Sequence, residues 1–446
     1  MGTPANPAIA YSNSVDNIAT LKELYSDDSW VMKDLVFDKN PFLAICPKDE
    51  TEMGMGGKSF PVPVMYDTGA GRSANLGNAQ TYQTAPQTVE FQVTRVSNYS
   101  VATLTNDFLR ASASNIGAFM PAAELNVKSA FRNCSNDLAH DMYGDGSGTR
   151  GSYGVGNGSI SSGVIILDNL GMVYQFAVGM ALVSFSVSGQ TPTQSTGANL
   201  GYVIAVDTGL GQITVSPTGP TGAAGTPTNW STSFPYLAQV GDVNFISNGL
   251  SSANMLKIAG LGAWIPSAAP GGADNFFGVN RSVSPTKLAG LRFQGGASES
   301  IQDSLIDAVN QLAAQSSEAG DPDYILINPV SYQTLVKQLT SQANYVNVKH
   351  DEIDISFKAL VLPTANGEIA ILQDRNCPAQ TAYVITLKTW KLRSLGKVPQ
   401  FLTFPGFYDQ LGFPVPGSDA VELRVGYYAN LTCNAPGANA VVPLAQ

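Results

Sequence analysis

The longest periodic pattern in this chain spans residues 116–142 and has helical spacing. Ser112 and Ser114 are candidate N-caps for this helix, and Gly144 is a candidate stop. Pro121 either lies in the first turn of its main segment or kinks it. This is the best-defined helix that the sequence predicts, because apolar side chains recur every third or fourth residue and form one face: Ile116, Met120, Ala123, Val127, Phe131, Cys134, Leu138 and Met142.

A two-stranded hairpin is predicted before this helix. Residues 58–66 read as a strand with Phe60, Val62 and Val64 on one face, and residues 88–96 alternate in the same way. Pro61 and Pro63 exclude a central position in a sheet. Residues 67–86 form a polar tip. An isolated hairpin is barely stable, so we expect this one to rest on something else.

Residues 164–266 have a different sequence pattern, in which short strands alternate with turns and few residues are charged. Strands are expected at residues 178–187, 202–206, 212–215 and 243–246, and residues 217–227 form a low-complexity loop. Regularly spaced short strands indicate a small barrel or sandwich. We interpret this segment as an inserted β-domain.

The rest of the chain mixes helices and strands, so the fold class is α+β. An N-terminal arm with one or two short helices is expected at residues 16–36. Helices are expected at residues 301–312 and 329–339. The expected strands are residues 324–327, 360–362, 369–372, 382–392 and 421–431.

Charge and composition limit the classes of function. The net charge is −10 and no basic run exists, which argues against direct gripping of nucleic acid. Charged residues make up 13%, about half the usual share, which suits a surface that faces other subunits or a glycine-rich secreted β-protein. No secretory signal or membrane-spanning run is visible. Since the four cysteines are far apart, we expect buried thiols of a protein made in the cytoplasm.

Catalytic motifs are absent or incomplete in the sequence. Residues 54–59 end like a phosphate-binding loop, but Glu52 stands where that motif needs glycine, and a strand follows instead of a helix. His140 reads as a solvated or core-edge histidine, and His350 lies in a polar loop. The acidic residues Asp351, Glu352 and Asp354 could bind a divalent cation, although a solvated turn is the simpler interpretation. We therefore predict no enzyme activity, no catalytic residues, no cofactor and no metal.

Read in order, these elements resemble the major capsid proteins of tailed bacteriophages. Segments that carry the resemblance are Gly144-Asp145-Gly146-Ser147-Gly148 after the long helix and Gly260-Leu261-Gly262-Ala263-Trp264-Ile265-Pro266 after the insert. The resemblance also includes Asn328-Pro329 before a helix, and Ala382-Tyr383 with Trp390 in the long strands. Only some members carry a barrel-like insert, and no long helical scaffolding segment precedes the arm. The second departure suggests a separate scaffolding protein or a chain numbered after processing.

The resemblance implies a fold with an arm, an extended loop, a spine helix, and peripheral and axial domains. The expected divisions are an arm at 1–55, the extended hairpin loop at 56–100, the spine helix and start of the peripheral domain at 101–163, the inserted β-domain at 164–268, and the axial domain with the remaining peripheral strands at 269–446.

The resemblance also implies a function. Hexamers and pentamers would form an icosahedral head shell around double-stranded DNA, as a virion protein assembled in the host bacterial cytoplasm. The expected partners are further copies of this chain, a scaffolding protein, a portal and a cement or decoration protein, with no membrane and no sequence-specific DNA binding.

Two sets of residues are singled out as sites by the resemblance. The expected spine comprises Ile116, Met120, Val127, Phe131, Leu138 and Met142. The expected intersubunit clamp comprises Lys58, Phe60, Val62, Val64, Tyr66, Arg72, Val89, Phe91, Val93 and Arg95.

Some family members crosslink their shells through a lysine on the extended loop. This chain has no lysine from Ser59 through Val127, and Lys58 lies at the hairpin base, so noncovalent shells are expected.

Two other classes of protein stay open at this point. A phage tail or fibre β-protein would suit the glycine-rich insert but predicts strand repeats, and none are visible. An enzyme with an unrecognised site is disfavoured by the presence of only two histidines.

Overall fold

The computed structural model describes residues 40–50, 57, 59–105, 116–155, 158–188, 191–194, 200–243, 255–272, 274–293, 300–315, 321–339, 345–350, 353–364, 367–403 and 412–444. The predicted arm helices at residues 16–36 lie outside this set. Contacts divide the chain into two units. Residues 1–38, 99–135 and 399–426 form the first unit, and the remaining residues form the second.

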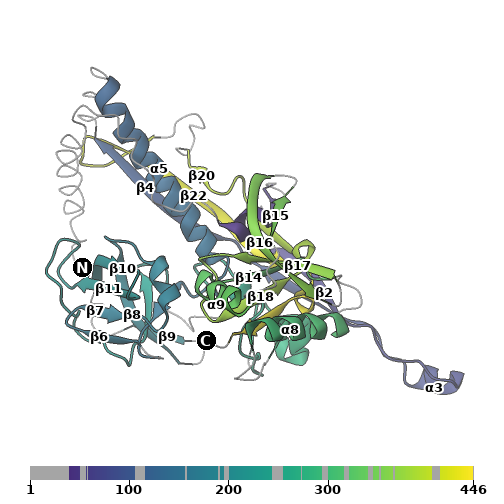
Figure 1. Cartoon of the computed structure of the whole chain (residues 1–446). Helices are drawn as coiled ribbons and strands as arrows, with labels where there is room; N and C mark the ends of the chain where they lie inside the picture. Colours follow the sequence, from purple (N-terminus) through teal and green to yellow (C-terminus); the bar gives the residue numbers. More distant parts are fainter. Residues whose placement is uncertain are drawn as a thin grey trace. The chain divides into compact units, whose positions relative to one another are not determined.

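The first unit contains most of the long helix α5 (Ile116–Asp141), as the apolar spacing predicts. Strands β4 (Val96–Thr105), β20 (Gln400–Phe401) and β21 (Gly412–Pro414) all pair with β22 (Ala420–Cys433). The helix lies along these strands (Figure 1), and Phe131 of α5 meets Phe401 of β20 with ring centroids 5.9 Å apart. The predicted strand 421–431 is confirmed as part of β22.

The second unit is centred on a mixed seven-stranded sheet with the order β13-β23-β18-β14-β17-β16-β15. Alternate residues of these strands face opposite sides, so Ile325 and Ile327 pack under the helices while Leu326 is buried on the other face. Both faces are therefore buried. The bounds are β13 (Leu291–Arg292), β14 (Tyr324–Ile327), β15 (Tyr345–His350), β16 (Ile353–Thr364), β17 (Gly367–Gln373), β18 (Thr381–Ile385), β23 (Ala440–Pro443), α8 (Ile301–Gln315) and α9 (Pro329–Leu339).

Local capping explains why α8 and α9 begin where the sequence predicts. The Ser300 hydroxyl accepts a hydrogen bond from the Asp303 backbone N–H at 3.1 Å. Asn328 Oδ1 accepts from the Val330 N–H at 3.0 Å, and Pro329 begins α9. Both bonds satisfy donors that a helix start leaves open.

The single long strand expected at residues 382–392 is wrong. The chain instead forms β18 in the seven-stranded sheet and then β19 (Trp390–Ser394), which pairs with β22 and with β1 (Lys48–Asp49) in another sheet. Asn439 Oδ1 causes the break, because it accepts from the Thr386 N–H at 2.9 Å and from Trp390 Nε1 at 2.8 Å. This buried amide turns the chain between the two sheets.

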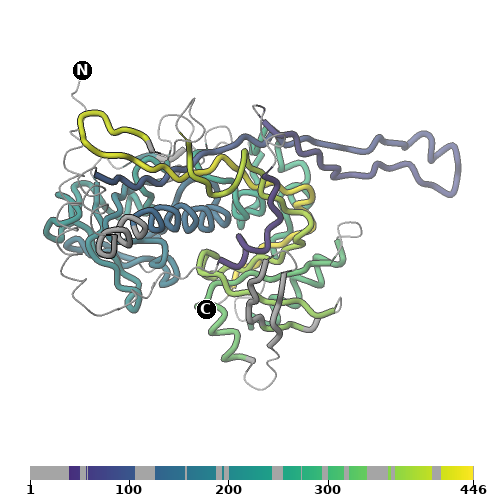
Figure 2. Tube along the Cα trace, turned by 90° about the horizontal axis from the view of Figure 1, so that it is seen from above, coloured from purple at the N-terminus to yellow at the C-terminus, as the bar shows by residue number. Residues whose placement is uncertain are grey.

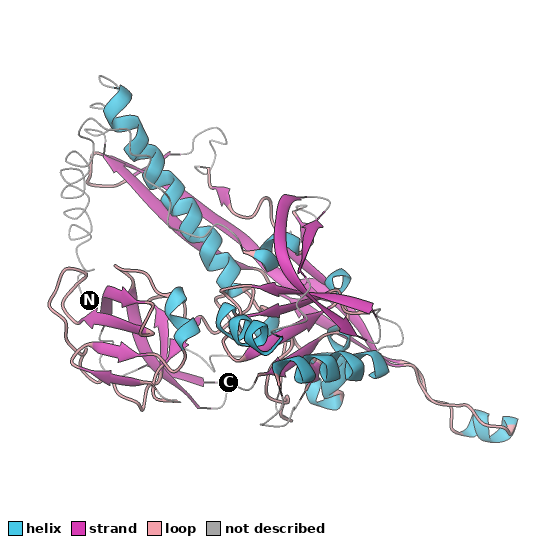
Figure 3. Cartoon of the chain, in the orientation of Figure 1, coloured by secondary structure: helices cyan, strands magenta, loops and turns pink. Residues whose placement is uncertain are grey.

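Most of the predicted insert is an eight-stranded sheet with the order β5-β12-β8-β10-β11-β7-β6, and β9 added to β8. Figure 3 shows these strands in magenta. One face holds a core with Tyr153, Phe176 and Trp230 at its centre. The bounds are β5 (Thr149–Ser152), β6 (Ser159–Ser161), β7 (Val164–Ile166), β8 (Ala181–Ser188), β9 (Thr191–Gln194), β10 (Gly201–Asp207), β11 (Gln212–Ser216) and β12 (Tyr236–Gln239).

This sheet differs from the expected barrel or sandwich in two respects. Its end strands β5 and β6 do not pair with each other among the described residues, so the order is open. It also begins before residue 164. The loop between β5 and β6 is fixed by the Asp168 carboxylate, which accepts from the N–H groups of Gly154, Val155 and Gly158. Strand β5 was not predicted because its partner β12 is distant in sequence.

The chain returns from this sheet to the end of α5. The N–H of Leu261, the first residue of α6 (Leu261–Trp264), donates to Met142 O at 2.8 Å, and Gly262 N donates to Tyr143 O at 3.2 Å. A Cβ on Gly260 would lie 2.3 Å from Met142 O, so only glycine fits this approach. The two chain passages are thus held side by side.

Candidate assembly site and interior pocket

The hairpin consists of β2 (Phe60–Asp67) and β3 (Gln87–Val93), paired in antiparallel register with Val62 opposite Phe91. Its base is anchored on the second unit. Phe91 packs against Trp264 and Phe276, with ring centroids 5.1 and 6.1 Å away, and the Arg393 guanidinium lies 3.8 Å from the Phe60 ring centroid. The support that the sequence analysis expected is therefore an aromatic cluster.

The far end of the hairpin has no such support. Figure 2 shows the hairpin extending as a long arm. Its tip carries the short helix α3 (Leu76–Thr81), none of whose residues is buried. Leu76 is 74% exposed and Tyr82 is 70% exposed. Within the described part of the chain, the tip therefore presents two large apolar side chains to solvent.

The predicted clamp residues separate into three groups. Val62, Val64, Phe91 and Val93 are buried within their own chain and hold the hairpin base, so they do not form a contact surface. Phe60, Tyr66 and Val89 are partly buried, whereas Arg72 and Arg95 are exposed. Lys58 lies outside the described residues. The sequence analysis missed Leu76 and Tyr82, although two large apolar residues in a polar tip were a visible signal.

The predicted spine residues also differ in environment. Leu138 and Met142 are buried, Val127 is partly buried, and Phe131 is exposed. The side chains of Ile116 and Met120 lie outside the description. The buried part of the predicted face is therefore the C-terminal part of α5.

A cluster of buried charges surrounds the end of α5. Arg150 Nη2 lies 2.9 Å from Asp137 Oδ1 and 3.5 Å from Asp242 Oδ2. Lys257 Nζ lies 3.1 Å from Asp242 Oδ1 and 3.7 Å from Asp141 Oδ2. We call these five residues the ionic cluster. Sequence reasoning missed it, because its members come from four separated segments.

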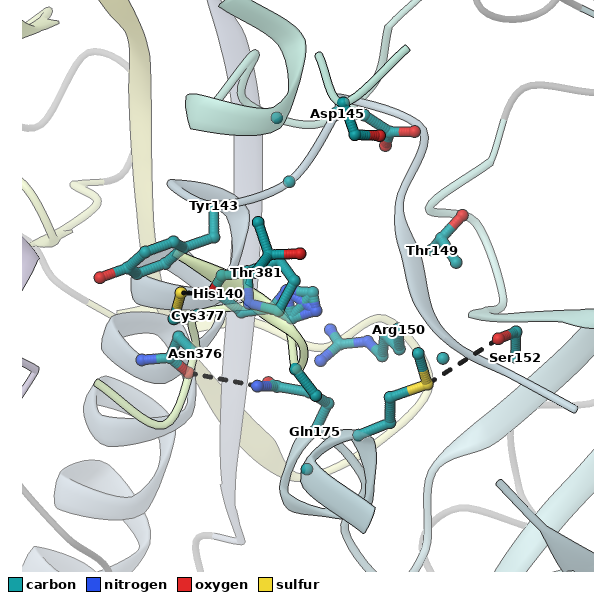
Figure 4. Close-up of a pocket in the computed structure, with 18 of the residues that line it drawn as sticks. His140, Tyr143, Asp145, Thr149, Arg150, Ser152, Gln175, Asn376, Cys377 and Thr381 are labelled. Atoms are coloured by element: carbon teal, nitrogen blue, oxygen red, sulfur yellow. Dashed lines mark hydrogen bonds between the residues drawn. The ribbon is translucent and has the colours of Figure 1, made fainter. Parts of the chain in front are cut away.

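Next to this cluster is a pocket of about 470 Å³. In Figure 4 the His140 ring and the Arg150 guanidinium point toward each other beside it. Both ring nitrogens of His140 are buried, and neither has a hydrogen-bond partner among the residues that the structure describes. Burial, followed by the charge of Arg150, lowers the pKa of His140 to about 3. His140 as a residue is partly exposed at the pocket wall, which agrees with the expected core-edge position.

The pocket offers no activated nucleophile or base. Burial raises the pKa of the Cys377 thiol well above its ordinary value, which keeps it protonated. The described part of the chain contains no group of three or more residues able to hold a metal ion. Cys46, Cys134, Cys377 and Cys433 are all buried and free, as predicted. Strand β2 begins directly after Ser59, so no helix follows the glycine-rich segment to bind a phosphate.

Comparison with known proteins identifies the family to which part of this chain is similar. Residues 242–408 match the family model of the SU10 major capsid protein. No curated protein matches the chain. Within the described residues, no helix is long and apolar enough to cross a membrane.

Solved capsid structures are similar to the chain over nearly its whole length. The capsid asymmetric unit of cyanophage A-1(L) superposes with a TM-score of 0.51 and 12% identity, covering 95% of this chain and 98% of that one. The capsid of a native GTA particle has a TM-score of 0.45 and 10% identity, covering 100% of each chain. The capsid of Myoviridae phage XM1 has a TM-score of 0.42 and 8% identity, covering 95% and 97%.

The α+β fold, with its extended hairpin and long helix, is the tailed-phage capsid fold. Residues 242–408 are in addition similar in sequence to the SU10 major capsid protein. The match favours the capsid over the tail or fibre alternative.

Proposed function

We propose that this chain is a tailed-phage major capsid protein that assembles into hexamers and pentamers of an icosahedral head shell enclosing double-stranded DNA. The hairpin tip carries this proposal, because its Leu76 and Tyr82 are largely exposed among the described residues. An antiparallel hairpin without a third element is only marginally stable. A neighbouring copy that receives the tip would supply that element and bury its apolar side chains.

The charge of the chain supports a container that does not bind DNA tightly. A net charge of −10 repels phosphate and leaves packed DNA free to slide. Scaffolding, portal and decoration proteins are also proposed as partners. The support for them is the similarity to capsid proteins alone.

Polar substitution of the tip tests the clamp. The double variant Leu76→Asp/Tyr82→Asp should fold normally, since both side chains are exposed in the subunit. It should not form closed shells, because two desolvated carboxylates in the interface would oppose assembly. Circular dichroism checks the fold, and electron microscopy with size-exclusion chromatography checks assembly.

Leu210→Asp is the matched control, because Leu210 is 67% exposed on the inserted sheet and distant from the tip in sequence. It should assemble as the parent does. Normal shells from the tip variant would contradict the clamp.

A further inference from the structure

The ionic cluster joins the inserted sheet to the long helix. Asp137 and Asp141 lie at the end of α5, Arg150 belongs to β5, Asp242 follows β12, and Lys257 precedes α6. The sheet therefore meets the helix through buried ion pairs. The side chains of Arg150 and Lys257 are each only 5% exposed.

The charges in this cluster do not balance when all five groups are ionised. Three carboxylates face two cations. Both charges of a buried pair are desolvated, so an extra unpaired charge there is costly. One proton bound to a carboxylate would restore equal numbers of positive and negative charges.

Asp141 is the carboxylate in the best position to hold that proton. Its side chain is 8% exposed, compared with 15% for Asp242 and 24% for Asp137. Its cation, Lys257, is closer to Asp242, at 3.1 Å compared with 3.7 Å. Tyr427 donates its hydroxyl hydrogen to Asp141 Oδ2 at 3.1 Å, a bond that a neutral carboxyl can also accept.

His140 does not change this balance, although it neighbours Asp141 on α5. Its pKa is lowered to about 3 by burial and then by Arg150, so the imidazole stays neutral over the relevant pH range. The groups that act on Asp141 are therefore Lys257, Asp137, Arg150 and Asp242, together with the Tyr427 hydroxyl.

We propose that Asp141 is a proton-binding site whose protonation strengthens the attachment of the inserted sheet to the end of α5. We call this attachment the joint. When Asp141 is ionised, the joint carries an excess negative charge. The protonated form leaves two cations paired with two carboxylates and keeps the Tyr427 hydrogen bond. The joint thus responds to pH.

The pKa values of the cluster agree with this arrangement. Burial raises the pKa of Asp141 to about 6 from its ordinary value of 3.8. A raised folded-state pKa means that the stabilisation is fully present below about pH 4 and is lost as the pH rises through about 6. The pKa of Asp137 shifts in the opposite direction. Burial raises this pKa, but the charges of Arg150 and Lys257 outweigh burial and lower it. The contribution of ionised Asp137 to stability is therefore lost only in stronger acid. The joint should therefore be strongest at about pH 4, where Asp141 is protonated and Asp137 is still ionised.

Replacing Asp141 by Asn tests the proposal, because the amide is neutral and similar in size to the protonated carboxyl. In the full-length chain, Asp141→Asn should raise the melting temperature at pH 8 by roughly 2–4 °C. The difference should shrink as the pH falls through about 6 and disappear below about pH 4, where Asp141 is protonated in both the folded and the unfolded parent. Infrared spectra of the parent should show a protonated carboxyl band that titrates near pH 6 and is absent from the variant.

Lys257→Met is the opposing control, since it removes a cation and enlarges the charge excess. It should lower the melting temperature more at pH 8 than at pH 5. The proposal is overturned if Asp141→Asn destabilises the chain at pH 8, or if the infrared band titrates near pH 4, because either result would show that the joint needs an ionised Asp141.

Discussion

Phe91 connects the hairpin to the body of the subunit. Its side chain is fully buried against Trp264 and Phe276, and the N–H of its neighbour Gln92 donates to Phe277 O at 3.0 Å. Alternation along residues 88–96 predicted that Phe91 faces inward. It did not predict the aromatic partners, because they follow the insert and are distant in sequence.

Truncating this side chain should loosen the hairpin base. Phe91→Ala removes a buried ring, which typically reduces stability by about 3–5 kcal/mol. Urea denaturation followed by tryptophan fluorescence should show an earlier transition, because Trp264 packs on the ring. Tyr82→Ala, at the exposed tip, should change the midpoint little. Equal midpoints for the two variants would contradict the anchoring role of Phe91.

Buried polar residues were the least predictable from the sequence. The environment of His140 and the ionic cluster depends on Arg150, Asp242 and Lys257, which no local pattern connects. Sequence periodicity identifies which face of an element is buried. It does not identify which charges meet there.

Elements with local start and stop signals were predicted closely. Helices α5, α8 and α9 and strand β14 have the expected position because periodicity, caps and Pro329 act within a few residues. The break between β18 and β19 escaped prediction because Asn439, distant in sequence, makes it. The same reason applies to β5, whose partner β12 is distant in sequence.

The inserted sheet is the element whose independence is easiest to test. Deleting residues 149–256 with a short linker should leave a folded core, since the chain leaves and returns beside Met142 and Leu261. Deleting residues 164–266 should give an unfolded or insoluble chain. That deletion removes Trp264, which is fully buried and donates its Nε1 hydrogen to Leu431 O at 3.0 Å.

Circular dichroism and thermal melts of the two deletions compare these outcomes. A stable core from the second deletion, or an insoluble first one, would mean that the structural boundary of the insert lies elsewhere.

At the scale of the whole molecule, the shells should be held without covalent links. The hairpin lacks lysine from Ser59 onward, so no amine lies on the tip. Mature particles boiled in detergent and reducing agent should give one band near 46.8 kDa on electrophoresis. A ladder of heavier bands would show crosslinks through another lysine.

The capsid fold was predictable from the sequence, because the order of hairpin, long helix and α+β core is visible in the apolar patterns. The proposed contact surface of the hairpin was less predictable from the sequence. Four of the predicted clamp residues are buried in their own chain, whereas the exposed tip residues were not singled out. Alternating apolar residues indicate burial, but not whether the same chain or a neighbour provides it.

The exposed tip of the hairpin has a consequence for the order in which subunits assemble. If each tip rests on the next subunit, an open chain of n subunits has n − 1 tip contacts, while a closed ring has n. The final contact adds stability without a further loss of translational and rotational freedom, which every earlier association loses. Closed rings should therefore accumulate beside free monomers, with dimers and trimers too short-lived to collect.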